Sequence, residues 1–409
     1  MSNQHLPVQE KVNKLVSLYE KNLLQEALIE AKSLANQHPN VPVIYNIYGV
    51  INIALGNWNQ SAICFSKAIK LKTDYVEAHH NLGIALDNLG QLEEAIQSYT
   101  KALELKPDFA TAHESLIRIL SFYNPKKPNL NPCIIANKLL QTINYNYDTN
   151  IQISDEDVVT FFQRCNNVIF ENINNLNMNE TEIFRSNTID LKCDRHFQVF
   201  NTFNVIPEYC FGCYKVQIGL RNVMELFKLY FVFDKLNLNN NNPRKCMLEM
   251  RSKVPGSYKG YIYCFGLSEA NEIQKQLIDM LNKKINKNIS ITVKRGCSEY
   301  GIAYPQYKKI NQNEDQLMKY NAEWRSKEKS IDDKLARRNQ SKQRVLRKNL
   351  PGATVCDILI MRNWIGYAKI IGDLSYKKIA KEVPISPVIE KRISDYLSKR
   401  KKEFSPSPD

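Results

Sequence analysis

Small and large apolar residues recur every 34 positions in the first third of the chain. Residues 42–75 and 76–109 superpose at this spacing, and residues 8–41 follow the same pattern without its paired glycines. The matching positions are Gly49 with Gly83, Gly56 with Gly90, Ser61 with Ala95, Phe65 with Tyr99, Ala68 with Ala102, and Thr73 with Pro107. Such a period predicts stacked helical hairpins, in which small residues let two helices approach closely and large ones fill the space between them.

The pattern changes after an amphipathic stretch at 155–173. Short alternating segments and two helical periods then follow one another in the order βαββαβ, which is the ferredoxin-like arrangement. We expect strand 213–218, helix 221–235, strand 245–251, strand 260–265, helix 268–284 and strand 289–295. In this order, Val216, Ile218 and Ile262 face the helices, and the opposite face of the sheet is open.

The remaining segments complete the predicted organisation. Residues 124–150 contain three prolines and many asparagines, a composition typical of a linker, and 357–372 reads as a buried helix. The predicted fold class is α + (α+β), an N-terminal α-solenoid followed by a ferredoxin-like unit and a basic helical tail. Its predicted regions are a helical array with a capping helix at 1–123, the linker 124–150, an α+β domain at 151–312, a basic helical region at 313–403 and a disordered tail at 404–409.

The repeats over residues 8–123 resemble the tetratricopeptide repeat (TPR) family. Gly83, Ala95, Ala102 and Pro107 stand where that family places its small residues and its helix-ending proline. The resemblance implies a superhelix whose groove holds a partner peptide or an extended segment of another protein. His79, His80 and His113 fall on the groove side of first helices, and we assign them no chemistry.

Charge is distributed unevenly along the 409 residues. The formal net charge is +14, yet residues 1–120 hold 10 Lys and Arg against 12 Asp and Glu, so the whole excess lies later in the chain. A basic segment of this kind favours an acidic partner such as nucleic acid. No apolar run is long enough to span a membrane or direct export, and ten scattered cysteines indicate reduced thiols, so we expect a cytoplasmic protein.

The segment 213–297 resembles an RNA-recognition motif. Lys259-Gly260-Tyr261-Ile262-Tyr263 is similar to the start of that family's third-strand signature, although Ile262 replaces a small residue and Gly266 replaces an aromatic one. The resemblance implies that the two tyrosines stack on bases on the open face of the sheet. The predicted nucleic-acid-binding residues are Lys215, Lys259, Tyr261, Tyr263 and Lys294. The alternative is that the tyrosines cover another part of the protein.

Two short spacings predict a metal site. Cys193 and His196 are three residues apart, as are Cys210 and Cys213, and such pairs can reach one tetrahedral ion across a tight turn. The ferredoxin-like strand order also brings Cys297 beside Cys213. We therefore predict structural zinc, with a redox dithiol and plain burial of the thiols as alternatives. The cysteines expected to be buried apolar residues are Cys64, Cys133, Cys165, Cys246, Cys264 and Cys356.

Evidence for catalysis is absent from the motifs. The chain has no Walker loop, no Gly-x-Ser-x-Gly and no His-Glu-x-x-His, and five of its six histidines precede residue 114. The favoured hypothesis is a non-catalytic scaffold that binds a partner peptide. The alternatives are an RNA-binding protein that uses the sheet and the basic tail, and a metal-dependent or thiol enzyme of unknown reaction.

Overall fold

The computed structural model describes residues 7–145, 151–186, 189, 191–252, 254–313, 315–338, 348–380, 382 and 385–404. The chain forms two compact units. The repeat unit comprises Met1–Ile119, Tyr123–Asn131 and Asp332–Val345, and the sheet unit comprises Leu120–Phe122, Pro132–Ile331 and Leu346–Asp409. Most of the tail predicted at 404–409 lies outside the described residues, as do 146–150 of the predicted linker.

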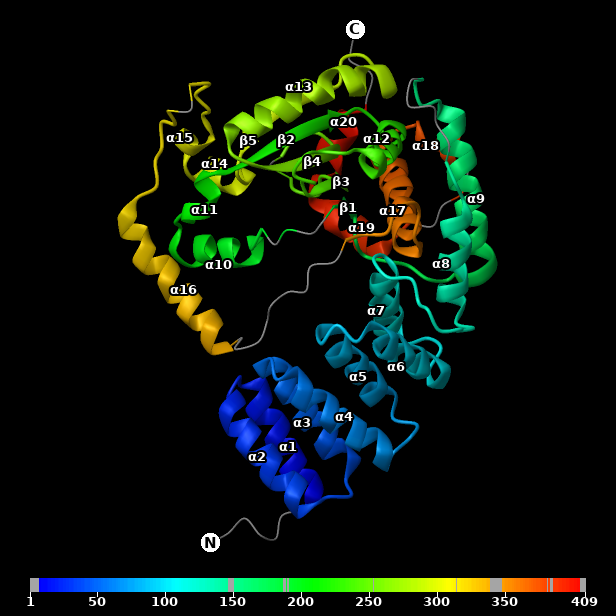
Figure 1. Ribbon diagram of the computed structural model, residues 1–409, viewed down its shortest axis with the longest axis vertical. Coiled ribbons are helices and arrows are strands. Elements are labelled where there is room, and N and C mark those ends of the chain that lie inside the picture. The colour runs from blue at the N-terminus through cyan, green and yellow to red at the C-terminus, as the bar shows by residue number, and fades with distance from the viewer. Residues whose placement is uncertain are drawn as a thin grey trace. The chain divides into compact units, whose positions relative to one another are not determined.

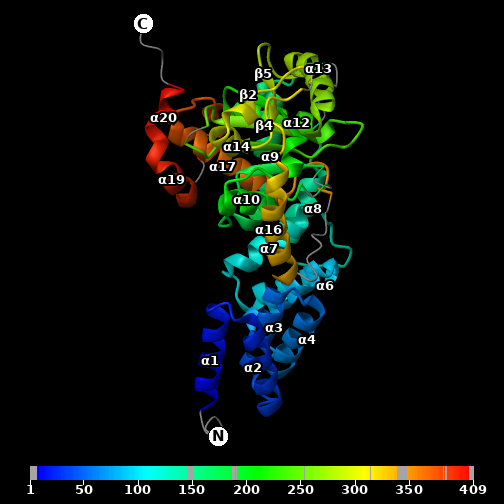
Figure 2. The ribbon, with the colours of Figure 1, turned by 90° about the vertical axis from the view of Figure 1, so that its left-hand side faces the viewer.

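The repeat unit is built from antiparallel helix pairs, as the 34-residue period predicts. Figure 2 shows α1–α4 standing side by side in this part of the chain. The helices are α1 (Val8–Glu20), α2 (Leu24–Gln37), α3 (Pro42–Leu55), α4 (Trp58–Leu71), α5 (Val76–Asn88), α6 (Leu92–Leu105) and α7 (Ala110–Leu120). Pro42 starts α3, where a missing amide donor costs nothing, and Gly56 ends it in the left-handed conformation.

Close approach of the two helices in a pair explains the paired glycines. A Cβ atom added at Gly83 would lie 2.5 Å from the Tyr99 ring, and one at Gly49 would lie 2.5 Å from the Phe65 ring. Both rings are almost fully buried. The glycine and the aromatic residue 16 positions later therefore form one packing contact, which the repeat uses twice.

The predicted linker does not behave as one segment. Residues 123–131 pack back on α6, where Tyr123 Oη donates to Glu93 at 2.8 Å and Asn129 donates to Thr100 Oγ1 at 3.4 Å. The following helix, α8 (Pro132–Thr142), contacts α9 and α17 of the sheet unit. This helix buries Cys133, Ile134, Ala136 and Leu140, so it belongs to a core and not to a spacer.

The sheet unit contains a five-stranded antiparallel sheet (Figure 1). Its order is β1-β3-β4-β2-β5, so the four predicted strands adopt the predicted neighbour relations and β1 is added beside β3. The register agrees with the predicted helix-facing residues, since Val216 pairs with Ile262 and Ile218 pairs with Gly260, where an added Cβ atom would lie 2.4 Å from Leu229 of α12. The strands are β1 (Glu182–Arg185), β2 (Cys213–Leu220), β3 (Arg244–Leu248), β4 (Tyr258–Phe265) and β5 (Ser290–Arg295).

Two helices cover one face of this sheet. α12 (Val223–Lys235) contacts β2, β3 and β4, and α13 (Leu267–Lys284) contacts β2, β4 and β5. A second layer packs on α12 and includes α9 and α17. The remaining elements are α9 (Asp155–Ile173), α10 (Cys193–Phe203), α11 (Glu208–Phe211), α14 (Ser298–Ala303), α15 (Pro305–Lys308), η1 (Ala322–Trp324), α16 (Arg325–Arg338), α17 (Val355–Ile371), α18 (Tyr376–Ile379), α19 (Pro387–Ile393), η2 (Ser394–Tyr396) and α20 (Leu397–Lys402).

The C-terminal helices are part of the sheet unit and not a separate basic region. Arg400 is fully buried and donates to the carbonyl oxygens of Glu249, Arg251 and Val254 at 3.1, 3.0 and 2.9 Å. The buried carboxylate of Asp373 accepts from Tyr258 Oη and from the amide of Val223, both at 2.7 Å. The guanidinium of Arg400 therefore satisfies backbone groups of the core.

Candidate functional site

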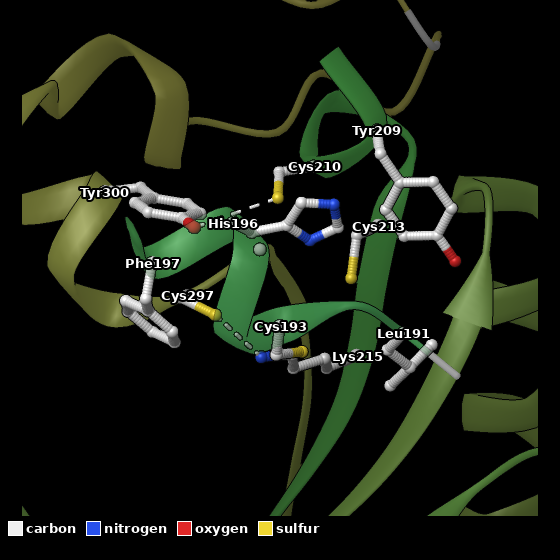
Figure 3. Close-up of a pocket in the computed structure, with 11 residues that line it drawn as sticks. Leu191, Cys193, His196, Phe197, Tyr209, Cys210, Cys213, Lys215, Cys297 and Tyr300 are labelled. Atoms are coloured by element: carbon white, nitrogen blue, oxygen red, sulfur yellow. Dashed lines mark hydrogen bonds between the residues drawn. The ribbon is translucent and has the colours of Figure 1, made fainter. Parts of the chain in front are cut away.

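All five predicted metal-binding residues line one pocket at the end of the sheet. Figure 3 shows Cys193, His196, Cys210, Cys213 and Cys297 turned toward a common space. Leu191, Phe197, Tyr209, Lys215, Gly296 and Tyr300 complete the wall. The free space is about 10 Å³, roughly what a single water molecule requires.

Each donor residue lies at or near the end of a helix or strand. Cys193 and His196 occupy the first turn of α10, Cys210 lies in the single turn of α11, and Cys213 is the first residue of β2. Cys297 lies two residues after the end of β5, at the N-cap of α14. β5 pairs with β2, and the amide of Gly296 donates to the Cys213 carbonyl at 2.8 Å. The predicted strand order thus brings Cys297 beside Cys213, although more than 80 residues separate them in sequence.

Burial favours the protonated form of the Cys193, Cys210 and Cys213 thiols by raising their pKa values. Desolvation raises the pKa of Cys213 to about 11 and also raises the pKa values of Cys193 and Cys210, and neighbouring thiols add to the increase. All ten cysteines are free thiols. A cation in the pocket would reverse this preference, because a metal ion stabilises the thiolate form.

Lys215 brings a positive charge into the same pocket. Its Nζ lies 3.3 Å from Cys297 Sγ and 5.0 Å from the centre of the Tyr263 ring. Burial by itself lowers the pKa of a lysine, but Cys297, Tyr263 and Cys213 outweigh that effect and raise the pKa of Lys215 well above its ordinary value. The side chain is only 8% exposed, so this ammonium group depends on pocket atoms for its electrostatic compensation.

Aromatic rings hold the ligand-bearing segments in place. The His196 ring stacks on Tyr209 with centroids 5.2 Å apart, and Tyr300 Oη lies 3.9 Å from Cys210 Sγ. Tyr307 Oη donates to the Cys210 carbonyl at 2.6 Å. Gly296 allows this last contact, because it has a φ of +54° and any Cβ there would overlap the Tyr307 hydroxyl.

The donor atoms of these cysteine and histidine side chains do not already surround one position. Within the described ranges, no three His, Cys, Asp or Glu side chains stand in the arrangement of a bound metal ion. The pocket therefore presents soft sulfur donors and one imidazole within reach of a single atom-sized space. Such a donor set suits zinc or a thiol reaction better than a calcium or magnesium site.

The sheet face predicted to be open is covered, which corrects the expectation on which nucleic-acid stacking rested. Tyr261 and Tyr263 are only 4% and 8% exposed, and Leu191 packs against both rings. Tyr261 Oη also donates to Gln217 Oε1 at 3.1 Å. A base cannot stack on rings that the protein already covers, so the predicted tyrosines fit the alternative in which they cover another segment.

The lysines on that face bind groups of the protein. Lys259 pairs with the fully buried Glu249 at 3.2 Å, and Lys294 donates to the hydroxyl of Ser298 at the start of α14. Burial, followed by the nearby Lys215 and Arg251, lowers the pKa of Lys294 to about 8. These cations are desolvated and compensated internally, unlike the solvent-exposed lysines that usually contact phosphates.

Sequence reasoning missed several residues that shape this end of the sheet. It assigned Lys215 to a nucleic-acid surface and did not consider Tyr209, Tyr300 or Tyr307. The signal was present in part, because Tyr300 follows Cys297 by three residues and Tyr209 precedes Cys210. These sequence neighbours hint that aromatic rings lie near two of the sulfurs, but only the fold shows that the rings line one pocket.

In the repeat unit, the first helices of successive hairpins form a second candidate surface. Asn81 donates to Asn46 at 3.1 Å, and His80 lies 3.3 Å from Ser115 Oγ, so α3, α5 and α7 are linked by contacts 35 residues apart. The ring nitrogens of His79 and His113 bind the Thr73 and Pro107 carbonyls at 2.9 and 2.8 Å. These histidines secure the turns between hairpins, which agrees with assigning them no chemistry.

Comparison with known proteins identifies the repeats. Residues 76–109 match the family model of the tetratricopeptide repeat. Protein FlbA of Caulobacter vibrioides (strain ATCC 19089 / CIP 103742 / CB 15) is 29% identical over 84 residues, which is 20% of this chain and 14% of FlbA. The chain thus contains a TPR segment, and it aligns with only a small part of that relative.

Some solved structures are similar to part of this chain. A crystal structure of MamA is 24% identical and covers 27% of this chain and 65% of its own, with a TM-score of 0.26. The first TPR of Spaghetti (RPAP3), bound to HSP90 peptide SRMEEVD, is 23% identical. The match covers 29% of this chain and 95% of that one, with a TM-score of 0.27. The Arabidopsis OM64 TPR domain is 20% identical. The match covers 27% of this chain and 93% of that one, with a TM-score of 0.27.

A search of the described helices for a bilayer-spanning segment finds none of sufficient length and apolar character.

Proposed function

We propose that this protein is an interaction scaffold whose repeat unit binds an extended segment of a partner protein on the face formed by α3, α5 and α7. The observation that carries the proposal is the contact ladder between these first helices, from Asn46 to Asn81 and from His80 to Ser115. It joins the helices into one surface with amide and hydroxyl groups at regular spacing. Repeat arrays use such extended surfaces to bind segments of other proteins.

Charge on the three helices defines the class of partner segment. α3 carries no charged residue, α5 carries only Glu77 and Asp87, and α7 carries Glu114 and Arg118. A segment rich in carboxylates would meet more negative than positive groups on this face, which opposes binding. We therefore expect a partner segment that is apolar and either neutral or basic. It would differ from the acidic peptide SRMEEVD, which is bound in the structure of the first TPR of RPAP3.

Selection from a displayed library of 12-residue peptides on the full-length chain tests this proposal. We expect enrichment of peptides poor in Asp and Glu, and weaker binding of SRMEEVD than of the selected peptides in fluorescence anisotropy. The variant Ile84→Glu alters the half-buried position one turn beyond Asn81 and should weaken the selected peptides at least tenfold.

A matched control uses the second helix of the preceding hairpin. Ile63 on α4 is 61% exposed, so Ile63→Glu adds the same charge away from the proposed face. Equal loss of binding in both variants, or no enrichment at all, would contradict the proposal.

For the sheet unit, we propose the ferredoxin-like arrangement with an added edge strand as its core. The order β3-β4-β2-β5, the antiparallel pairing and the two helices on one face support it. Ten free thiols, most of them buried, support a reducing compartment such as the cytoplasm. Fractionation of cells that make the protein tests the second point, and recovery in an oxidising compartment would overturn it.

A further inference from the structure

The pocket at the end of the sheet combines features that a plain cysteine-rich core does not need. Four thiols and one imidazole from four separate segments line a space of about 10 Å³. By contrast, Cys246 and Cys264 are buried on the helix-covered face of β3 and β4, where each packs as a small apolar residue. Convergence of the other sulfurs on one small space is therefore specific to this corner.

The spacing of the donor residues along the chain is typical of a site for a single ion. Cys193 and His196 lie on the first turn of α10, and Cys210 and Cys213 flank the turn that leads into β2. Two pairs of this kind supply four ligands, the number that a tetrahedral structural zinc site uses.

The buried charge in the wall points to a negatively charged group in the pocket. Lys215 is 8% exposed, and its Nζ donates to Cys297 Sγ at 3.3 Å, a weak acceptor as a thiol. Two other cations of this face have carboxylate partners, Lys259 with Glu249 and Lys245 with Glu182, whereas Lys294 binds the Ser298 hydroxyl. Zinc held by three thiolates and a neutral imidazole carries one net negative charge, which the ammonium of Lys215 compensates.

We propose that this pocket binds one zinc ion through Cys193, His196, Cys210 and Cys213. Cys297 is the outer thiol, which accepts a hydrogen bond from Lys215 and does not ligate the metal. The ion joins α10, α11 and the start of β2, segments that also meet through the stacking of His196 on Tyr209 and through Glu328, which binds both Arg195 and the amide of Glu208. Its role is structural, because the protein provides four ligands and the space leaves no room for a substrate.

Metal content of the full-length protein tests the proposal directly. We expect about one zinc per chain by mass spectrometry after purification under reducing conditions without chelator. Replacement by cobalt(II) should give the visible absorption of a tetrahedral site and a thiolate charge-transfer band in the near ultraviolet. This measurement uses the unmodified chain, so it does not depend on any variant folding.

Variants identify the ligands. Cys193→Ser, Cys210→Ser and Cys213→Ser should each lower zinc content at least fivefold, whereas Cys297→Ser and Cys264→Ser should keep it. A chain that is free of zinc and takes up none on titration would overturn the proposal, as would stoichiometric iron in place of zinc. Loss of zinc from Cys297→Ser with retention in Cys193→Ser would overturn the ligand assignment. Peptide binding by the repeats is measured separately and does not depend on this result.

Discussion

At the scale of single residues, a glycine is required at one position in the middle of a helix of the repeat unit. Gly83 packs directly against the Tyr99 ring, which is 2% exposed and cannot move into solvent. Glycine normally weakens a helix interior by about 1 kcal/mol relative to alanine. Its presence in the middle of α5 is explained by packing, because an added methyl group would occupy the space of the ring.

Substitution Gly83→Ala should therefore destabilise the repeat unit despite the better helix propensity of alanine. We expect a net loss of about 1–3 kcal/mol in the free energy of unfolding, as for other overpacked cores. Chemical denaturation followed by circular dichroism measures it. In a Tyr99→Ala background the same substitution should cost much less, since the ring is gone; an equal cost in both backgrounds would contradict the packing explanation.

Acid sensitivity of the repeat unit should depend on His80. Its imidazole is buried between Tyr99 and Phe109 and faces Ser115, and burial lowers its pKa. Below the ordinary histidine value of about 6.5, the unfolded chain then binds more protons than the folded one, so stability falls as the pH falls. Unfolding curves at several pH values between 7 and 5 should show a smaller decrease for His80→Asn than for the wild type. The half-exposed His113→Asn variant controls for removal of an imidazole from the same unit.

At the scale of elements, α17 connects the layers of the sheet unit. Its Thr354–Asp357 capping box is the signal that starts the helix, and Trp364 donates from its indole nitrogen to the Thr181 carbonyl at 2.9 Å. Asp357 also pairs with Arg185 of β1 at 3.1 Å, while Arg185 binds Asp234 of α12 at 2.6 Å. One buried guanidinium thus joins a strand and two helices that are distant in sequence.

The variant Asp357→Asn tests this connection. It removes one charge of a buried network and weakens the helix cap, so we expect a loss of about 3 kcal/mol, the lower end for a broken buried ion pair, because Asp234 still compensates Arg185. Hydrogen exchange of α17 amides should accelerate in the variant. The matched substitution Asp279→Asn, at an exposed position of α13, should leave that exchange unchanged.

At the scale of the whole molecule, each unit has a core of its own. Val12, Leu15 and Ala27 belong to one cluster in the repeat unit, and the sheet unit buries nearly all of α12 and α17. Domains with separate cores commonly unfold in separate transitions. We expect two transitions in calorimetry, with Gly83→Ala lowering one and Asp357→Asn lowering the other; a single transition shifted by both variants would contradict this.

The sequence predicted the four strands and two helices of the βαββαβ order, and the helix at 357–372, to within a few residues, because alternation and helical periodicity are local properties. It did not predict burial of the second sheet face. Tyr261 and Tyr263 alternate with apolar residues as an exposed stripe would, yet Leu191 covers them from a segment about 70 residues earlier in the chain. Such coverage depends on contacts between distant segments, which no local pattern records.

By itself, the sequence determined the helical repeats, the strand order and the set of cysteines around one corner, since periodicity and short spacing act through neighbouring residues. Only the tertiary structure decided which basic side chains are buried and which groups they bind. Arg400, Lys259 and Lys215 read as a basic surface, but folding places them against carbonyl groups, a carboxylate and a sulfur. The physical reason is desolvation: a buried cation needs a partner, and only the folded chain supplies one.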